Sequence, residues 1–138
     1  MNSFIDNFTQ KCIQKPELIY LIDGTGACIS LLGQLLLYNY LQEYFTLSFE
    51  IRKILLSHIG LIIVGDVFLY FKKTLKYLRL IEFANLYSVI KTVSILITEY
   101  EHITLVENAY YSIEILVLIA LIALENHIFR AYKNQFEG

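Results

Sequence analysis

Four apolar segments of about 20 residues each constrain the fold of this chain more than any other feature. They cover residues 18–41, 51–71, 80–98 and 105–126. An α-helix needs about 20 mainly apolar residues to cross the hydrocarbon core of a bilayer. Helices and closed barrels are the structures that satisfy every backbone polar group in that core. The segments therefore predict an all-α membrane protein, with four transmembrane helices in one up-down bundle that spans residues 1–138.

Composition favours a lipid-facing surface over a soluble one. Of the 138 residues, 57% are hydrophobic and 17% are charged. Soluble domains average roughly 45–50% apolar and about 25% charged residues, and a small domain needs polar residues for its large exposed surface. The alternative is a soluble bundle of amphipathic helices, but the first segment is apolar around its whole circumference. The formal net charge of -2 does not indicate a nucleic-acid partner.

The basic residues between the segments predict an orientation. With four crossings, both termini and the middle loop lie on one side, and the short loops over residues 39–50 and 98–104 lie on the other. Loops that carry more Lys and Arg stay cytoplasmic. We therefore expect a bacterial inner-membrane protein with cytoplasmic termini, and Ser48 as the N-cap of the second helix. The termini side holds eight basic residues and the other side two, Arg52 and Lys53; the eight are Lys11, Lys15, Lys72, Lys73, Lys76, Arg79, Arg130 and Lys133.

The N-terminal segment, residues 1–16, lacks the apolar core and small-residue cleavage site of a signal peptide. Phe4, Ile5, Phe8 and Cys12 recur at helical spacing in it. This pattern fits a short helix on the membrane surface, and a frayed polar tail fits it equally well.

No motif in the chain predicts a metal or another cofactor. Cys12 and Cys28 form no C-x-x-C pair, and the sequence contains no Walker A string and no H-E-x-x-H. His58 is the one histidine expected near mid-depth, and such a residue is more often a hydrogen-bonded bundle residue than a ligand. We expect no catalytic residue from these patterns.

The fourth segment carries three carboxylates on one face. Glu107, Glu114 and Glu125 are 7 and 11 residues apart. At about 100° per residue, both intervals return to within about 20° of the same azimuth. Glu107 and Glu125 lie near the ends of the segment; we expect Glu107 to be solvated, whereas solvation and an inward position fit Glu125 equally well. Glu114 lies near the bilayer centre, where a carboxyl group requires a proton or a cation.

Lys91 is the first candidate partner for Glu114. Lys91 lies 11 residues from the inner end of the third segment, and Glu114 lies 11 residues from Glu125 in the fourth. The two therefore fall at one level and are positioned to form an ion pair. The alternative is that Lys91 extends outward toward the interface.

The first segment also carries an acidic residue, in the string "DGTG". Asp23, Ser30 and Gln34 follow i, i+7 and i+11 spacing, so they share a helical face. This face predicts either inward packing or a polar pathway. Gly24 and Gly26 either allow a neighbouring helix to approach closely or permit local unwinding beside Asp23.

A second polar level is expected towards the cytoplasm. Asp23 and Asn85 lie five residues into their segments, and Asp66 lies five residues from the end of its own. Arg79 is the nearest expected counter-charge. The group is either a cation or proton site or a structural polar network.

Three strings resemble a family of small four-helix membrane proteins from Bacteroidota bacteria. They are "LIDGTGA" followed by Ser30, "FANLYS", and "IEILVLIALIALE". Lys91 departs from the family pattern, where an uncharged residue is expected, so the ion pair with Glu114 is not implied by the family. The resemblance implies the four-helix topology and no activity.

Two functions are expected to compete. One is an oligomeric channel or transporter that conducts protons or a small cation through the intramembrane carboxylates. The other is a non-enzymatic subunit, or stabilising partner, of a larger membrane complex. Besides the lipid bilayer, a homo-oligomer or a membrane-protein partner is therefore expected. An intramembrane enzyme with Glu114 and His58 as acid and base is a third reading.

Overall fold

The computed structural model describes residues 2–137, and these residues form helices and loops without any strand. The all-α bundle predicted from the sequence is confirmed, with one short helix in addition to the four long ones. Four of the helices are long and apolar enough to cross a membrane. The helices are α1 (Asn2–Gln14), α2 (Glu17–Tyr40), α3 (Phe49–Lys72), α4 (Leu78–Thr98) and α5 (Leu105–Phe136).

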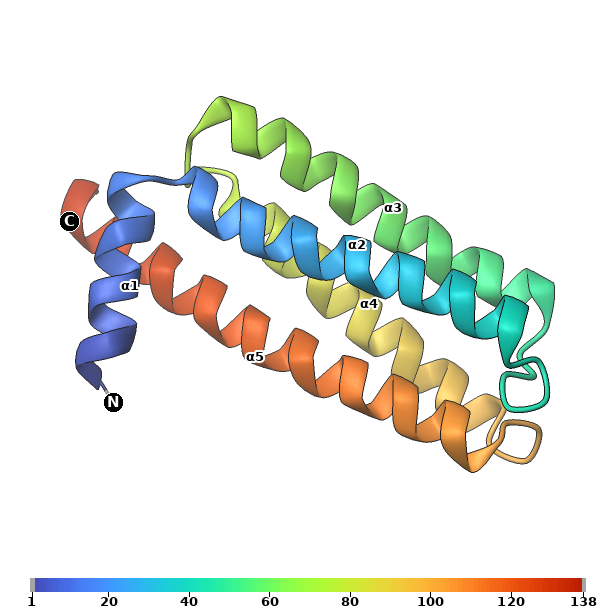
Figure 1. Cartoon of the computed structure of the whole chain (residues 1–138). Helices are drawn as coiled ribbons and strands as arrows, with labels where there is room; N and C mark the ends of the chain where they lie inside the picture. Colours follow the sequence, from blue (N-terminus) through green and yellow to red (C-terminus); the bar gives the residue numbers. More distant parts are fainter. Residues whose placement is uncertain (1, 138) are drawn as a thin grey trace.

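Two helical hairpins form the bundle (Figure 1). α2 packs along α3, α4 packs along α5, and α3 packs against α4 to join the hairpins. α2 and α5 make few direct contacts, although they close the ring of four. Both termini lie at the same end as the connection between α3 and α4 (Figure 1). The segments that were predicted to share the basic side of the membrane therefore lie at one end of the bundle.

The helix ends follow local capping chemistry. The Ser48 side chain accepts a hydrogen bond from the Ile51 N–H at 3.4 Å, so the predicted N-cap of α3 is present. Thr104 caps α5 in the same way, since its side chain accepts from the Glu107 N–H at 3.1 Å. α5 continues ten residues beyond the predicted end at residue 126. Its extension is held by packing, because Ile128 is fully buried.

The short helix α1 runs across the end of the bundle (Figure 1) and contacts α5 and α2. It buries Thr9 and Cys12 and leaves Phe4 exposed. The Gln135 side chain donates a hydrogen bond of 3.2 Å to that of Gln10, which ties α1 to the end of α5. The frayed-tail alternative is therefore wrong for residues 2–14, whereas a position on a membrane surface stays a prediction.

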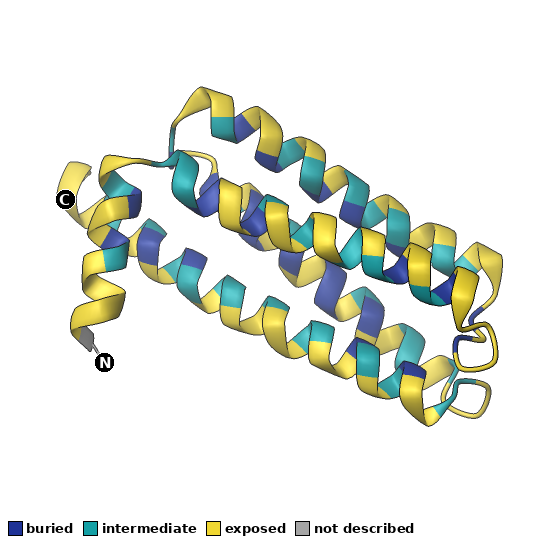
Figure 2. Ribbon diagram, in the orientation of Figure 1, coloured by how far each residue is buried: buried dark blue, intermediate teal, exposed yellow. Residues whose placement is uncertain are grey.

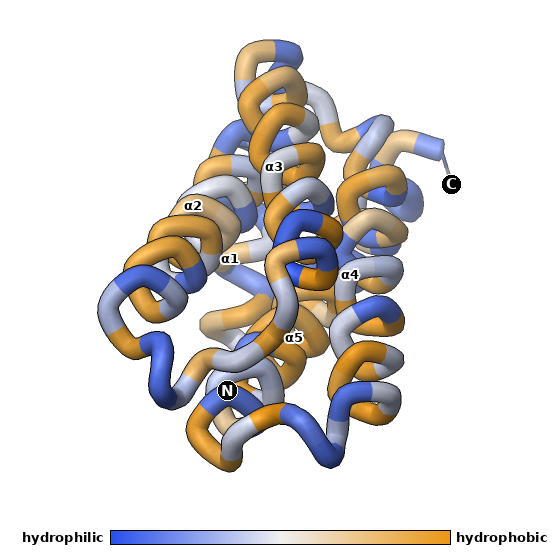
Figure 3. Tube along the Cα trace, turned by 90° about the vertical axis from the view of Figure 1, so that its right-hand side faces the viewer, coloured by the Kyte–Doolittle hydropathy of each residue, from blue (hydrophilic) through white to orange (hydrophobic). Residues whose placement is uncertain are grey.

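Burial in this bundle is inverted relative to a soluble protein. On the long helices, exposed large apolar side chains outnumber buried ones, and Leu61 and Ile97 are each 71% exposed. Figure 2 shows the buried positions on the inner sides of the helices, and Figure 3 shows how much of the long helices is hydrophobic. Because water favours the opposite distribution, this surface suits lipid. The buried polar residues are Thr9, Asp23, Gln34, Asp66, Glu82, Asn85, Ser88, Thr92, Glu107 and Glu125.

Candidate functional site

Three polar levels lie along the inner face of α5, one at each of the glutamates predicted to form a stripe. Glu107 and Glu125 are fully buried, and Glu114 is partly buried between them. All three side chains have hydrogen-bond partners on other helices or loops. The stripe therefore faces the bundle interior along its whole length.

Glu107 joins the start of α5 to the loop between α2 and α3. Its carboxylate accepts hydrogen bonds from the Thr46 N–H at 3.0 Å and the Leu47 N–H at 3.1 Å. The hydroxyls of Thr46 and Tyr38 also donate to it, and Tyr111 lies 3.0 Å from the Tyr38 hydroxyl. The expectation of a solvated end carboxylate was wrong at Glu107. Backbone donors from residues 46 and 47 replace water there.

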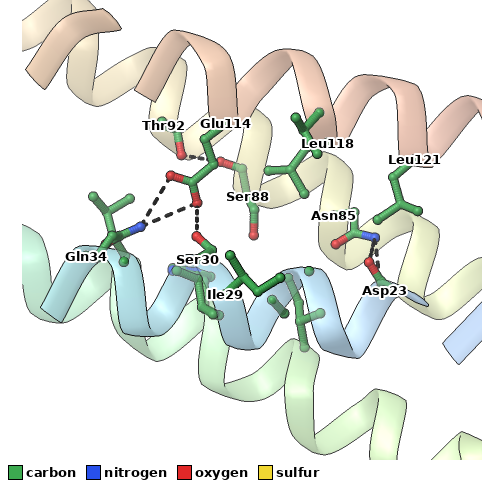
Figure 4. A pocket seen from close by; sticks show the side chains of 18 of the residues that line it. Asp23, Ile29, Ser30, Gln34, Asn85, Ser88, Thr92, Glu114, Leu118 and Leu121 are labelled. Atoms are coloured by element: carbon green, nitrogen blue, oxygen red, sulfur yellow. Dashed lines mark hydrogen bonds between the residues drawn. The ribbon is translucent and has the colours of Figure 1, made fainter. Parts of the chain in front are cut away.

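Glu114 lies at mid-height, directed from α5 towards α2 (Figure 4). The Ser30 hydroxyl donates a hydrogen bond to one carboxylate oxygen. The side-chain amide of Gln34 donates to both oxygens at 3.4 Å. Gly33 allows Tyr110 to approach this group, because a Cβ at residue 33 would lie 3.1 Å from the Tyr110 hydroxyl. The polar face predicted for α2 thus meets the glutamate stripe of α5.

A cavity of about 320 Å³ surrounds this carboxylate. Its apolar walls come mainly from α3 and α5, with Leu55, Ile59 and Ile62 on one side and Leu118 and Leu121 on the other. Cavities that hold small molecules occupy about 300–1,000 Å³ and combine apolar walls with a few polar groups. The cavity around Glu114 has both properties.

Lys91 and His58 also line this cavity, but neither pairs with Glu114 among the ion pairs and hydrogen bonds of residues 2–137. The Lys91 ammonium lies 5.9 Å from the centre of the Tyr87 ring. The His58 ring lies 5.0 Å from the same ring, and its Nδ1 is 2.7 Å from the Ile54 carbonyl. The predicted Lys91–Glu114 ion pair is therefore absent, because equal depth does not place two side chains on facing sides of their helices.

The inner level joins two carboxyl groups through one amide, and a third, Asp66, packs against Gly24 beside them. The Asn85 Nδ2 donates to both oxygens of Asp23, at 3.2 and 3.3 Å, and to those of Glu125, at 3.1 and 3.4 Å (the Asp23 bonds are drawn in Figure 4). Asp66 is 1% exposed, and neither of its oxygens has a partner among the described hydrogen bonds. The predicted convergence of Asp23, Asp66 and Asn85 is present, and Glu125 joins it.

Arg79 does not neutralise this group. It pairs with Glu82 at 2.9 Å, one turn along α4, and its guanidinium lies 4.9 Å from the centre of the Phe129 ring. Among residues 2–137, no Lys or Arg forms an ion pair with Asp23, Asp66 or Glu125. An unpaired buried charge costs several kcal/mol. Three such carboxyl groups therefore need bound protons or a cation to remain in the bundle interior.

The two glycines of "DGTG" differ in their surroundings. A Cβ on Gly24 would lie 3.3 Å from the Asp66 Cβ, so this glycine lets α2 and α3 approach closely. A Cβ on Gly26 would meet no atom within 4 Å. α2 is helical without interruption from Glu17 to Tyr40, so the alternative of local unwinding at these glycines is wrong.

Within the described part of the chain, no cluster of three or more His, Cys, Asp or Glu residues has the geometry to hold a metal ion. Cys12 and Cys28 are both free thiols, the first buried and the second exposed.

Several residues of these levels were not singled out from the sequence, among them Tyr38, Ser88, Thr92 and Tyr110. Ser88 and Thr92 are three and seven residues after Asn85 on α4, and all three are buried. Tyr110 lies four residues before Glu114 on α5. These helical intervals could have placed the three residues on the inner faces of their helices. Tyr38 could have been placed in the same way, since it lies four residues after Gln34 on the face shared with Asp23 and Ser30.

Comparison of the chain with protein-family models, with curated proteins and with solved structures found no match. The resemblance to Bacteroidota membrane proteins therefore stays a prediction from its three strings.

Proposed function

We propose that this protein is an integral membrane transporter or channel that moves protons or a small cation by way of Glu114. One observation carries the proposal: Glu114 lies in a cavity at mid-height of the bundle and has no basic partner among the described ion pairs. A carboxyl group at membrane depth is rare and usually marks an ion or substrate pathway. The group around Asp23, Asp66 and Glu125 would serve as a second station near the termini.

A flux assay in proteoliposomes tests this function. We expect wild-type protein to dissipate an imposed pH or cation gradient, and Glu114→Gln to slow the flux at least tenfold. Glu43→Gln is the matched control, because Glu43 is an exposed carboxylate on the loop between α2 and α3. Equal fluxes for wild type and Glu114→Gln would refute the proposal, as would the absence of flux in wild type.

The orientation belongs to the same proposal. The basic residues favour an inner membrane with the termini and the α3–α4 connection in the cytoplasm. A tag on the C-terminus should then resist protease added outside spheroplasts and become cleavable after lysis. Cleavage in intact spheroplasts would reverse the orientation.

Four helices enclose little volume, so we also propose that the functional unit is a homo-oligomer. Mass measurement in a mild detergent tests this, and a monomer with full flux would exclude it.

A subunit of a larger membrane complex is the second candidate function. Gly26 favours it, because this exposed glycine has open space around it where a partner helix could approach closely. Co-purification of one stoichiometric membrane partner, lost in Gly26→Phe, would support this reading over transport.

A further inference from the structure

The cavity around Glu114 is open on one side of the bundle. The exposed residues of its lining all belong to α2 and α5, whereas α3 and α4 contribute buried or half-buried residues to its floor. Ile29, Ile113 and Val117 are 61–67% exposed at this mouth. They lie near mid-height of the membrane-spanning segments, and α2 and α5 barely touch. The mouth therefore faces the hydrocarbon core and not the water at either end.

Unsatisfied polar atoms line the same cavity. The Oε1 of Gln34, the Oδ1 of Asn85 and the Oγ of Ser88 have no hydrogen-bond partner within the described chain. All three side chains are at least nine-tenths buried. Two of these atoms are amide carbonyl oxygens, which only accept hydrogen bonds. Buried acceptors without donors are costly, so the cavity suits a ligand that donates N–H or O–H groups.

Charge narrows the class of ligand further. The carboxyl group of Glu114 disfavours an anion, and it is the acidic group nearest the mouth. Lys91 lines the cavity as well, but its ammonium lies over Tyr87, which is outside the lining. Apolar walls and a lateral mouth favour a molecule that reaches the site from the bilayer.

We propose that the cavity between α2 and α5 binds an apolar organic molecule that carries a protonated amine, with the ammonium hydrogen-bonded to Glu114. The ammonium supplies both the positive charge that complements the carboxylate and the N–H donors that the free acceptors require. The hydrocarbon part lies against Ile59, Ile62 and Leu118. This inference rests on the same Glu114 carboxylate as the proposed transport function, and it adds lipophilic amines as a ligand class of that site.

Three matched probes test the inference by calorimetric titration of the full-length protein in lipid nanodiscs. 1-Aminoadamantane carries charge and N–H donors, its trimethylammonium analogue carries charge without donors, and 1-adamantanol is neutral. We expect the amine to bind at least tenfold more tightly than either analogue. Equal affinities for the amine and the alcohol would overturn the proposal.

Variants locate the bound amine. Glu114→Gln should weaken amine binding at least tenfold, whereas Glu43→Gln and Lys91→Met should not weaken it. Gly26→Phe should block the mouth, and Gly26→Ala is its control, because a small side chain there meets no atom within 4 Å. Amine binding that persists in Glu114→Gln or in Gly26→Phe, with the helical circular dichroism of wild type, would overturn the proposal.

The two proposals fail separately. Proton or cation flux that depends on Glu114, without selective amine binding, would remove the amine and leave the transport function. Selective amine binding that depends on Glu114, without any flux, would leave the binding site and remove the transport function.

Discussion

Replacing Glu107 by alanine should destabilise the bundle more than replacing any other acidic residue at that end. Alanine leaves the buried Leu47 N–H without an acceptor, which costs about 1–3 kcal/mol. It also reduces the Tyr38 hydroxyl from two partners to one, for about 1 kcal/mol more. Water can replace the carboxylate at the exposed Thr46. The expected loss is therefore about 2–4 kcal/mol.

Reversible unfolding by SDS in mixed micelles, followed by far-ultraviolet circular dichroism, measures this loss. Glu101→Ala is the matched control, because Glu101 is exposed in the loop between α4 and α5. It should change the free energy of unfolding by less than about 0.5 kcal/mol. A double-mutant cycle of Glu107→Ala with Tyr38→Phe should give a coupling energy of about 1 kcal/mol. The reasoning fails if Glu107→Ala and Glu101→Ala have the same stability, or if the coupling energy is zero.

Two further predictions concern α2 and α1. Gly24→Val should destabilise the bundle by about 1–3 kcal/mol through overpacking against Asp66, whereas Gly26→Ala should be neutral or stabilising by up to about 1 kcal/mol; equal effects in the same unfolding assay would contradict the difference in packing. Burial raises the pKa of the Cys12 thiol to about 11; in a Cys28→Ser background, which removes the exposed thiol, alkylation by iodoacetamide should therefore stay slow near pH 8 and accelerate towards pH 11. The unfolded chain loses this proton near pH 9, so burial of Cys12 should lower stability as pH rises from 9 to 11, and fast labelling of the folded protein at pH 8 would refute the buried position.

The fold was predictable because the features that determine it can be read directly along the sequence. Segment length and apolar content locate α2, α3 and α4 to within about two residues. The end of α5 was not predictable in the same way. Asn126, His127 and Arg130 resemble a solvated terminus, yet α5 continues because Ile128 is buried in one apolar cluster with Cys12 of α1 and Ile19 of α2. That contact joins residues more than 100 positions apart.

The site was predictable in its levels and not in its pairs. Helical spacing brought Asp23, Ser30 and Gln34 to one inner face, and depth brought Asp66 and Asn85 to the level of Asp23. Whether two side chains form an ion pair also depends on the direction each takes from its helix and on nearer partners, and depth in the bundle gives neither. Lys91 and Glu114 therefore do not form the predicted ion pair.

Arg79 and Glu107 show the local competition. Arg79 forms an ion pair with Glu82, three residues away, and not with the deeper acidic residues. The donors to Glu107 include backbone N–H groups of the loop over residues 41–48, and helical periodicity carries no information about a loop.

The packing of α1 on α5 has a consequence for biosynthesis. The ribosome makes residues 2–14 before the four long helices, but the buried face of α1, with Thr9 and Cys12, is covered in part by the last turns of α5. During translation this face therefore stays uncovered until α5 has been made. α1 can then dock on α5 only after all four long helices have been made.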